Sequence, residues 1–382
     1  MIDCNHLTSA ATCGTLRSFL IVLMVHMEKQ NRQSNFEILR ILSMLMIIAF
    51  HSVWHYKLFI GSCEFSANKL LNDILYYGGE LGVNCFALIS GYFLITTNFK
   101  WKKLISMILQ IYFYFYFCRI ALIFFTTAPL DVYDFSSWFF PVLQGQYWFI
   151  SAYIFAYILT PFLQKLIFAM NRREFEFLIC SQFLIWSFFP TIFLTTVGKT
   201  TENMIFYNRY VWIIFLYLVG AYIKLYGNPF FYSARRSLAI FVATAAVLFL
   251  YIVLIEFFFN DTKSAIQFWG NNSLFQMVLS LSIFSFFQNL NIGCHPKINR
   301  IATTMLGVYL LHEGPFRNGI WHKVFVLVGH ETDLFLFARI LFAILFVMFA
   351  GVIVELCRQP FEKYIFNILR RINTEFKNKK NF

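Results

Sequence analysis

The chain carries an apolar run, FEILRILSMLMIIAFH, over Phe36–His51. Within it, Arg40 and His51 are eleven residues apart. Eleven residues make about three helical turns, so both side chains share one face at an axial separation of about 16 Å. That separation is half of the ~30 Å hydrocarbon thickness of a bilayer. A titratable group inside a membrane is costly, so this pair is a candidate functional site.

The whole chain has the composition of a polytopic membrane protein. Of its 382 residues 59% are hydrophobic and 13% are charged, and the mean hydropathy is +0.64; soluble domains carry about 25% charged residues. We predict an all-α helical bundle of about ten transmembrane helices. They are expected near 36–56, 79–95, 104–127, 147–168, 175–194, 207–225, 238–259, 273–287, 301–321 and 334–356. No length remains for a sizeable soluble domain.

The distribution of basic residues predicts the topology. Lys29 and Arg32 precede the first predicted span, and Lys and Arg gather after the second, fourth, sixth, eighth and tenth. The alternate loops carry acidic residues, such as Asp131 and Asp134, or mixtures of both charges. Because basic loops mark the cytosolic side, both termini are predicted to be cytosolic. The net charge of +12 then follows from topology and does not indicate a nucleic-acid partner.

We predict one membrane domain, 35–356, between an N-terminal tail, 1–34, and a basic cytosolic tail, 357–382. The first 26 residues contain an apolar stretch that is too short to span a membrane, and no small-residue cleavage site follows it. A weak signal peptide is one interpretation, and we favour a translation start at Met27. The eight cysteines form no CxxC pair, which argues against a disulfide framework or a zinc site built on cysteine pairs.

A second polar cluster, His312 and Glu313, lies in the ninth predicted span, just before Gly314-Pro315. Counted from the cytosolic end of that span, His312 is about 18 Å along the helix, close to the depth of His51. The Gly-Pro pair should end or bend the helix. Two imidazoles at matching depth, one beside a carboxylate, suit proton transfer in a cavity that opens outward. A structural ion pair is the alternative.

His51 and His55 have the spacing of two metal ligands, but no third ligand accompanies them locally, so no metal site is predicted. Three other polar residues lie inside predicted spans and are candidates for intramembrane support: Asn84, Ser90 and Arg119. Small and polar groups such as Asn84 and Ser90 allow close helix contacts. The long side chain of Arg119 could extend to the outer membrane surface, or it could pair with a carboxylate. Its candidate partners are Glu80, Glu256 and Glu313.

Four stretches resemble, in order, the acyltransferase family 3 membrane proteins, which O-acylate sugars of bacterial surface glycans. They are the Arg40-x10-His51 pair, GVNCFALISGYF over Gly82–Phe93, YWFISAY over Tyr147–Tyr153 with Pro161-Phe162-Leu163, and GVYLLHE over Gly307–Glu313. The resemblance extends over about 35–356 and is to the single-domain members.

The resemblance implies a multi-pass enzyme of a bacterial inner membrane. Its donor would be cytosolic acyl-CoA, with acetyl-CoA favoured, and its acceptor a hydroxyl of a surface polysaccharide or lipid-linked oligosaccharide. Arg40 would bind phosphates of coenzyme A. His51 would be the general base or a proton relay, while His312 and Glu313 would orient that base or the acceptor. No tightly bound cofactor is expected, and membrane lipid is expected to surround the chain. The resemblance leaves open whether the acyl group is transferred directly or through a covalent acyl-histidine.

A proton-coupled transporter or flippase of a glycan precursor is the alternative function. Buried His, Arg and Glu side chains along a path are what such a protein needs. Against it, the sequence has no paired, interrupted helices in two related halves, which many transporter folds show.

Overall fold

The computed structural model describes residues 33–55, 65–125, 138–143, 147–194, 207–228, 230–315, 317, 320–321, 325 and 334–380. For 122–125, 193–194, 262–263 and 369–380 only the backbone is described. The predicted start at Met27, almost all of the N-terminal tail and the loop with Asp131 and Asp134 lie outside these residues.

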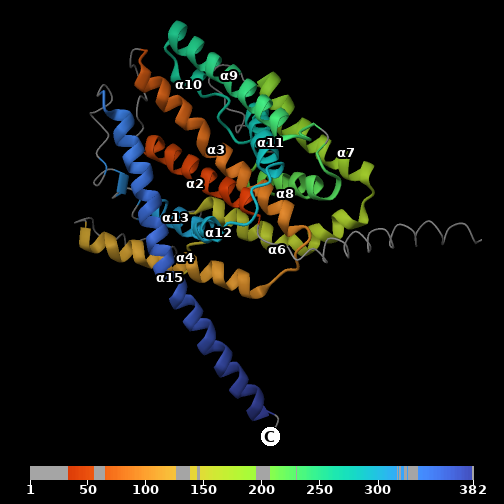
Figure 1. Cartoon of the computed structure of the whole chain (residues 1–382), viewed down its shortest axis with the longest axis vertical. Coiled ribbons are helices and arrows are strands. Elements are labelled where there is room, and N and C mark those ends of the chain that lie inside the picture. Colours follow the sequence, from red (N-terminus) through yellow and green to blue (C-terminus); the bar gives the residue numbers. More distant parts are fainter. Residues whose placement is uncertain are drawn as a thin grey trace, which may run out of the picture.

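Helices occur in each predicted membrane segment, in two pieces in the ninth, and the described part of the chain is all-α (Figure 1). The first helices are α2 (Ser34–Trp54), α3 (Ala67–Leu94), α4 (Trp101–Phe125), α6 (Trp148–Ala169) and α7 (Arg172–Phe183), which two π-helical turns continue, η2 (Leu184–Phe188) and η3 (Pro190–Leu194). The others are α8 (Arg209–Tyr226), α9 (Ala234–Phe259), the short α10 (Thr262–Ala265), α11 (Leu274–Gln288), α12 (Pro296–Ala302), α13 (Met305–His312) and α15 (Leu336–Lys380).

The prediction of a polytopic membrane bundle is confirmed. Among the described residues, seven helices are long and apolar enough to cross a membrane. The remaining predicted spans are α3, α11 and the pair α12–α13. Of these, α3 carries charged residues, α11 has 15 residues, and the ninth predicted span is in two pieces. At the other extreme, only 11% of the most apolar stretch of α9 is buried inside the protein, as expected of a helix that faces lipid.

The helix α3 begins at Ala67, well before the start predicted near residue 79. Ser66 caps it, since its hydroxyl accepts a hydrogen bond from the backbone N–H of Lys69. The Lys69 ammonium lies 2.5 Å from the Glu256 carboxylate of α9 and donates to Asn260 over 2.6 Å. The first turns of α3 therefore bury polar groups against partners that are distant in sequence, and no local apolar pattern marks them.

The ninth predicted span is broken twice. The helix α12 ends at Ala302, α13 begins at Met305, and α13 ends at His312 with Glu313 as its C-cap. The break predicted at Gly314-Pro315 is confirmed. This break leaves His312 and Glu313 at the end of a short helix inside the bundle.

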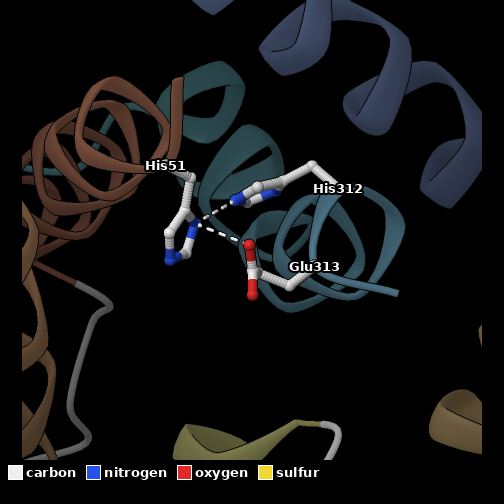
Figure 2. A group of neighbouring side chains, drawn as sticks. All are labelled: His51, His312 and Glu313. Carbon is white, nitrogen blue, oxygen red and sulfur yellow. Dashed lines mark hydrogen bonds and ion pairs between the residues drawn. The ribbon is translucent and has the colours of Figure 1, made fainter. Parts of the chain in front are cut away.

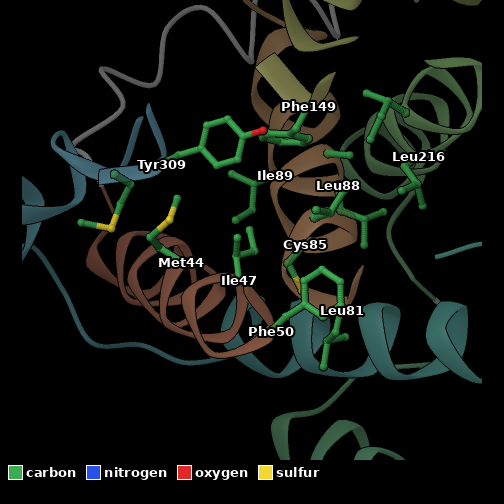
Figure 3. Packing of buried hydrophobic residues seen from close by; sticks show 14 of the residues in the cluster. Met44, Ile47, Phe50, Leu81, Cys85, Leu88, Ile89, Phe149, Leu216 and Tyr309 are labelled. Atoms are coloured by element: carbon green, nitrogen blue, oxygen red, sulfur yellow. The ribbon is translucent and has the colours of Figure 1, made fainter. Parts of the chain in front are cut away.

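The helices α2, α3 and α8 approach one another closely at glycine residues, which have no side chain. A Cβ placed on Gly82 of α3 would lie 2.5 Å from the Ser43 carbonyl oxygen of α2. A Cβ on Gly91 would overlap the backbone of Tyr217 in α8. Glycines allow such approach in membrane bundles, where tight packing takes the place of the hydrophobic effect. Figure 3 shows apolar side chains between α2 and α3, with Ile47 of α2 directed toward Ile89 of α3.

We predict that Gly91→Ala destabilises the protein, because the added methyl group meets backbone that has no room to move. Overpacking of this kind costs about 1–3 kcal/mol, so the free energy of unfolding should fall by about 2 kcal/mol. The measurement is thermal unfolding in detergent. The control is Gly78→Ala on the same helix, where the new Cβ would be 3.5 Å from Met46. Equal melting temperatures for the two variants would contradict the close approach of α3 and α8.

Candidate functional site

A cavity of about 180 Å³ opens between α2, α3, α6, α8 and α13. Its polar lining residues are His51, His55, Glu80, Arg209, Glu313 and Arg317. Its aromatic lining residues are Phe50, Trp54, Trp148, Phe149, Trp269 and Tyr309. This combination of ring faces with a few converging polar groups is typical of a small-molecule site.

The predicted catalytic residues meet at this cavity (Figure 2). Nδ1 of His51 lies 3.0 Å from Nε2 of His312 and 3.3 Å from Oε1 of Glu313. All three side chains are buried; the exposed fractions are 8% for His51, 0% for His312 and 7% for Glu313. The end of α2 and the end of α13 bring these groups together. The similar membrane depth inferred for the two histidines thus corresponds to a direct contact.

The backbone of α13 determines which nitrogen of each ring carries a proton. Nδ1–H of His312 donates to the Val308 carbonyl over 2.6 Å. With both rings neutral, Nε2 of His312 is then an acceptor, so Nδ1–H of His51 donates to it. Nε2 of His51 keeps its lone pair, and Figure 2 shows this nitrogen on the side of the ring away from His312 and Glu313. His51 is therefore arranged to accept a proton at Nε2.

The Glu313 carboxylate has further partners at the cavity. His55 Nε2 lies 2.6 Å from Oε1, and Arg317 Nη1 lies 3.9 Å from Oε2. His55 lies one turn after His51 in the sequence, a spacing that indicates a possible metal ligand but does not predict this contact with Glu313. Arg317 follows the Gly314-Pro315 break, and beyond this break helical periodicity no longer predicts where the Arg317 side chain points. His55 thus forms a hydrogen bond with the buried carboxylate, and Arg317 adds an ion pair that helps to compensate its charge.

A second ionic pair lines the cavity and was not predicted from the sequence. Arg209, at the start of α8, lies 3.6 Å from a Glu80 carboxylate oxygen of α3. Its guanidinium group is 4.9 Å from the ring centre of Trp148 and 5.9 Å from that of Trp269. At the start of a span, a lone arginine reads as an interfacial anchor. Only the folded chain shows that this cation faces the cavity.

Arg40 lies at the other end of α2 from the cavity. It forms an ion pair with Glu37, one turn before it, and its guanidinium is 5.7 Å from the ring centre of Phe93. Its side chain is 24% exposed. The cavity extends along α2 as far as Ile47, and Arg40 is not among its lining residues.

The three predicted support residues lie outside the cavity lining. Asn84 is fully buried, donates to the Asn271 carbonyl over 2.8 Å and accepts from the Trp212 indole over 3.1 Å, which links α3 to α8. Ser90 donates to the Phe86 carbonyl of its own helix. The Arg119 guanidinium lies over two aromatic rings, 5.2 Å from Phe115 and 5.3 Å from Trp138. Of its candidate partners, Glu80 pairs with Arg209, Glu256 with Lys69 and Glu313 with the histidines.

A comparison with protein families gives one match over most of the chain. The model of the acyltransferase 3 family, described as an acyltransferase domain, matches residues 33–356. No curated protein and no solved structure matches the chain significantly.

The ligand atoms of His51, His312 and Glu313 lie within 4.8 Å of one another, near enough to hold a metal ion. Each of these atoms already has a proton partner. The two imidazole nitrogens pair with each other at 3.0 Å, and Glu313 Oε1 pairs with His55 at 2.6 Å. A network of shared protons accounts for these distances without a metal, so the absence of a metal site stays our prediction.

We expect the purified protein to contain zinc only far below one ion per chain. Added Zn²⁺ should raise the melting temperature of the wild type no more than that of His312→Ala, because a ligand stabilises only the fold that binds it. Metal analysis and thermal unfolding are the measurements. Equimolar zinc in the wild type that disappears in His312→Ala would establish a metal centre and overturn the prediction.

Proposed function

The chain belongs to the acyltransferase 3 family, and on that premise we propose that it transfers an acyl group from acyl-CoA to a sugar hydroxyl. Acetyl-CoA is the favoured donor, and the acceptor is a surface polysaccharide or a lipid-linked oligosaccharide at a bacterial inner membrane. The observation that supports this proposal most is the buried network of His51, His312 and Glu313 beside an aromatic cavity.

The hydrogen-bond geometry of the site supports the following course for the proposed reaction. The acceptor oxygen attacks the thioester carbonyl carbon while its proton moves to Nε2 of His51. A C–O bond forms, the C–S bond breaks, and the coenzyme A thiolate leaves and takes the proton back from His51. Glu313, with Oε1 3.3 Å from Nδ1 of His51, stabilises the positive charge that develops on the ring. His312 holds the ring in its working orientation.

The cavity has the groups that a sugar acceptor requires. The rings of Trp148 and Trp269 offer apolar faces for the C–H side of a sugar ring. Arg209 with Glu80, and Arg317 with Glu313, offer charged hydrogen-bond partners for hydroxyl groups. We therefore place the acceptor in this cavity, on the predicted outer side of the membrane.

The donor reaches His51 from the other end of α2 in this proposal. Arg40 is predicted to face the cytosol, and its partly exposed guanidinium is a ready partner for a phosphate of coenzyme A. It lies about 16 Å along the helix from His51, a span for the extended pantetheine arm to cross. Donor and acceptor thus approach the same imidazole from opposite sides.

We predict that His51→Ala lowers kcat by about 10²–10⁴-fold, the usual contribution of a general base. Release of coenzyme A from acetyl-CoA by purified protein measures this, as does the acetyl increment in glycan mass spectra of cells that express each variant. His295→Ala, at an exposed histidine, is the control and should keep wild-type activity. Full activity of His51→Ala would refute its role. Wild-type protein that binds acetyl-CoA without turnover would instead favour the transporter.

We predict that Arg40→Ala raises the KM for acetyl-CoA by roughly 10–100-fold with a smaller change in kcat, since a charged hydrogen bond contributes about 1.5–3 kcal/mol. Steady-state kinetics with varied acetyl-CoA measures this. The control is Arg172→Ala, which removes an exposed arginine that also pairs within its own helix, with Glu176. An unchanged donor KM in Arg40→Ala would remove Arg40 from the donor site.

A further inference from the structure

Tyr309 has a buried hydroxyl with no hydrogen-bond partner among the described residues. The residue is 4% exposed and lines the same cavity as His51 and Glu313. Buried polar groups are nearly always paired, so an unpaired one at a reaction site requires an explanation. A ligand atom that is present only during the reaction would provide the missing partner.

The position of Tyr309 is fixed relative to the proton network. It lies on α13 one turn before His312, and its ring packs edge-on against the His312 ring with centres 6.0 Å apart. Its own carbonyl accepts the backbone N–H of Glu313 over 3.1 Å. The helix α13 therefore fixes the position of the Tyr309 hydroxyl relative to His312 and Glu313.

The first turn of α6 lies beside this hydroxyl. Figure 3 shows the Tyr309 hydroxyl pointing toward Phe149, and the two rings pack edge-on with their centres 5.9 Å apart. The helix begins at Trp148, and its N-cap residue Tyr147 makes no side-chain cap. First-turn amides have no acceptor within a helix, and the positive end of the helix dipole lies there. Trp148 and Phe149 both line the cavity.

Thioester attack creates a negative charge that needs such donors. When the acceptor oxygen bonds to the carbonyl carbon, the C=O π electrons move to the carbonyl oxygen, and they return when the C–S bond breaks. We propose that the Tyr309 hydroxyl and the uncapped first turn of α6 form the oxyanion hole for this intermediate. This inference rests on the proposed function and makes Tyr309 a catalytic residue.

The carboxylates of the cavity do not oppose this assignment. Glu313 is compensated by His55 and Arg317, and Glu80 by Arg209. Their charges are thus directed to other groups in the lining. The thioester oxygen then meets neutral and positive donors on the side of Tyr309 and α6.

The test is Tyr309→Phe, which keeps the ring and removes only the oxygen. Loss of one oxyanion donor typically lowers kcat by about 10²–10³-fold, and we expect about 10²-fold with an unchanged KM for acetyl-CoA. Transfer to glycan and slow transfer to water should fall by the same factor, because both pass through the oxyanion. The control is Tyr217→Phe, whose hydroxyl is also buried without a hydrogen-bond partner among the described residues but does not line the cavity; it should keep wild-type rates.

Three results would overturn the inference. Tyr309→Phe could match Tyr217→Phe in rate, or it could lose only glycan transfer while keeping hydrolysis, which would make Tyr309 an acceptor-binding residue. The third result concerns a variant with 3-fluorotyrosine at position 309, which retains the hydroxyl and is used if Tyr309→Phe also lowers the melting temperature. A rate of this variant as low as that of Tyr309→Phe would overturn the inference. Wild-type protein without acetyl-CoA turnover would reject the proposed function itself, before Tyr309 is tested.

Discussion

The contact between His51 of α2 and His312 of α13 joins two segments that are 261 residues apart in sequence. In a membrane interior no water is available to satisfy a polar side chain, so these imidazoles must find partners within the protein. The Val308 carbonyl, Glu313 and His55 complete the set. The surrounding helices hold these groups in place, so that each polar side chain keeps its hydrogen-bond partner.

The tight packing of α2, α3 and α8 provides the rigid frame for that set. Gly82 and Gly91 allow backbone to approach backbone, and small shifts at these points would move α2 relative to α13. Proton transfer depends on donor–acceptor distances of about 2.6–3.2 Å. A shift of α2 by the width of one methyl group would therefore lengthen these distances and lower the rate of proton transfer.

Much of the fold and the central pair of the site could be predicted from sequence, for physical reasons that also explain the failures. Apolar segments of spanning length predicted the helices, and helical spacing predicted similar depths for His51 and His312, whose side chains are in contact. The N-terminal turns of α3 were missed because Lys69 hides its charge against Glu256, a partner that no local pattern reveals. Arg209 was missed because an arginine at the start of a span has the same sequence signal whether it faces a cavity or lipid headgroups.

The broken ninth segment has a consequence for the proposed chemistry. Because α13 ends at His312, the side chains of His312 and Glu313 at the end of this helix lie next to the ring of His51. The first turn of α6 lies beside Tyr309 at the same cavity, and its amides carry partial positive charge. In the proposed transfer, positive charge grows on His51 while negative charge grows on the thioester oxygen. The end of α13 thus supplies the side chains that stabilise the positive charge, and the start of α6 supplies the amides proposed to stabilise the negative charge, which an unbroken ninth helix could not position in this way.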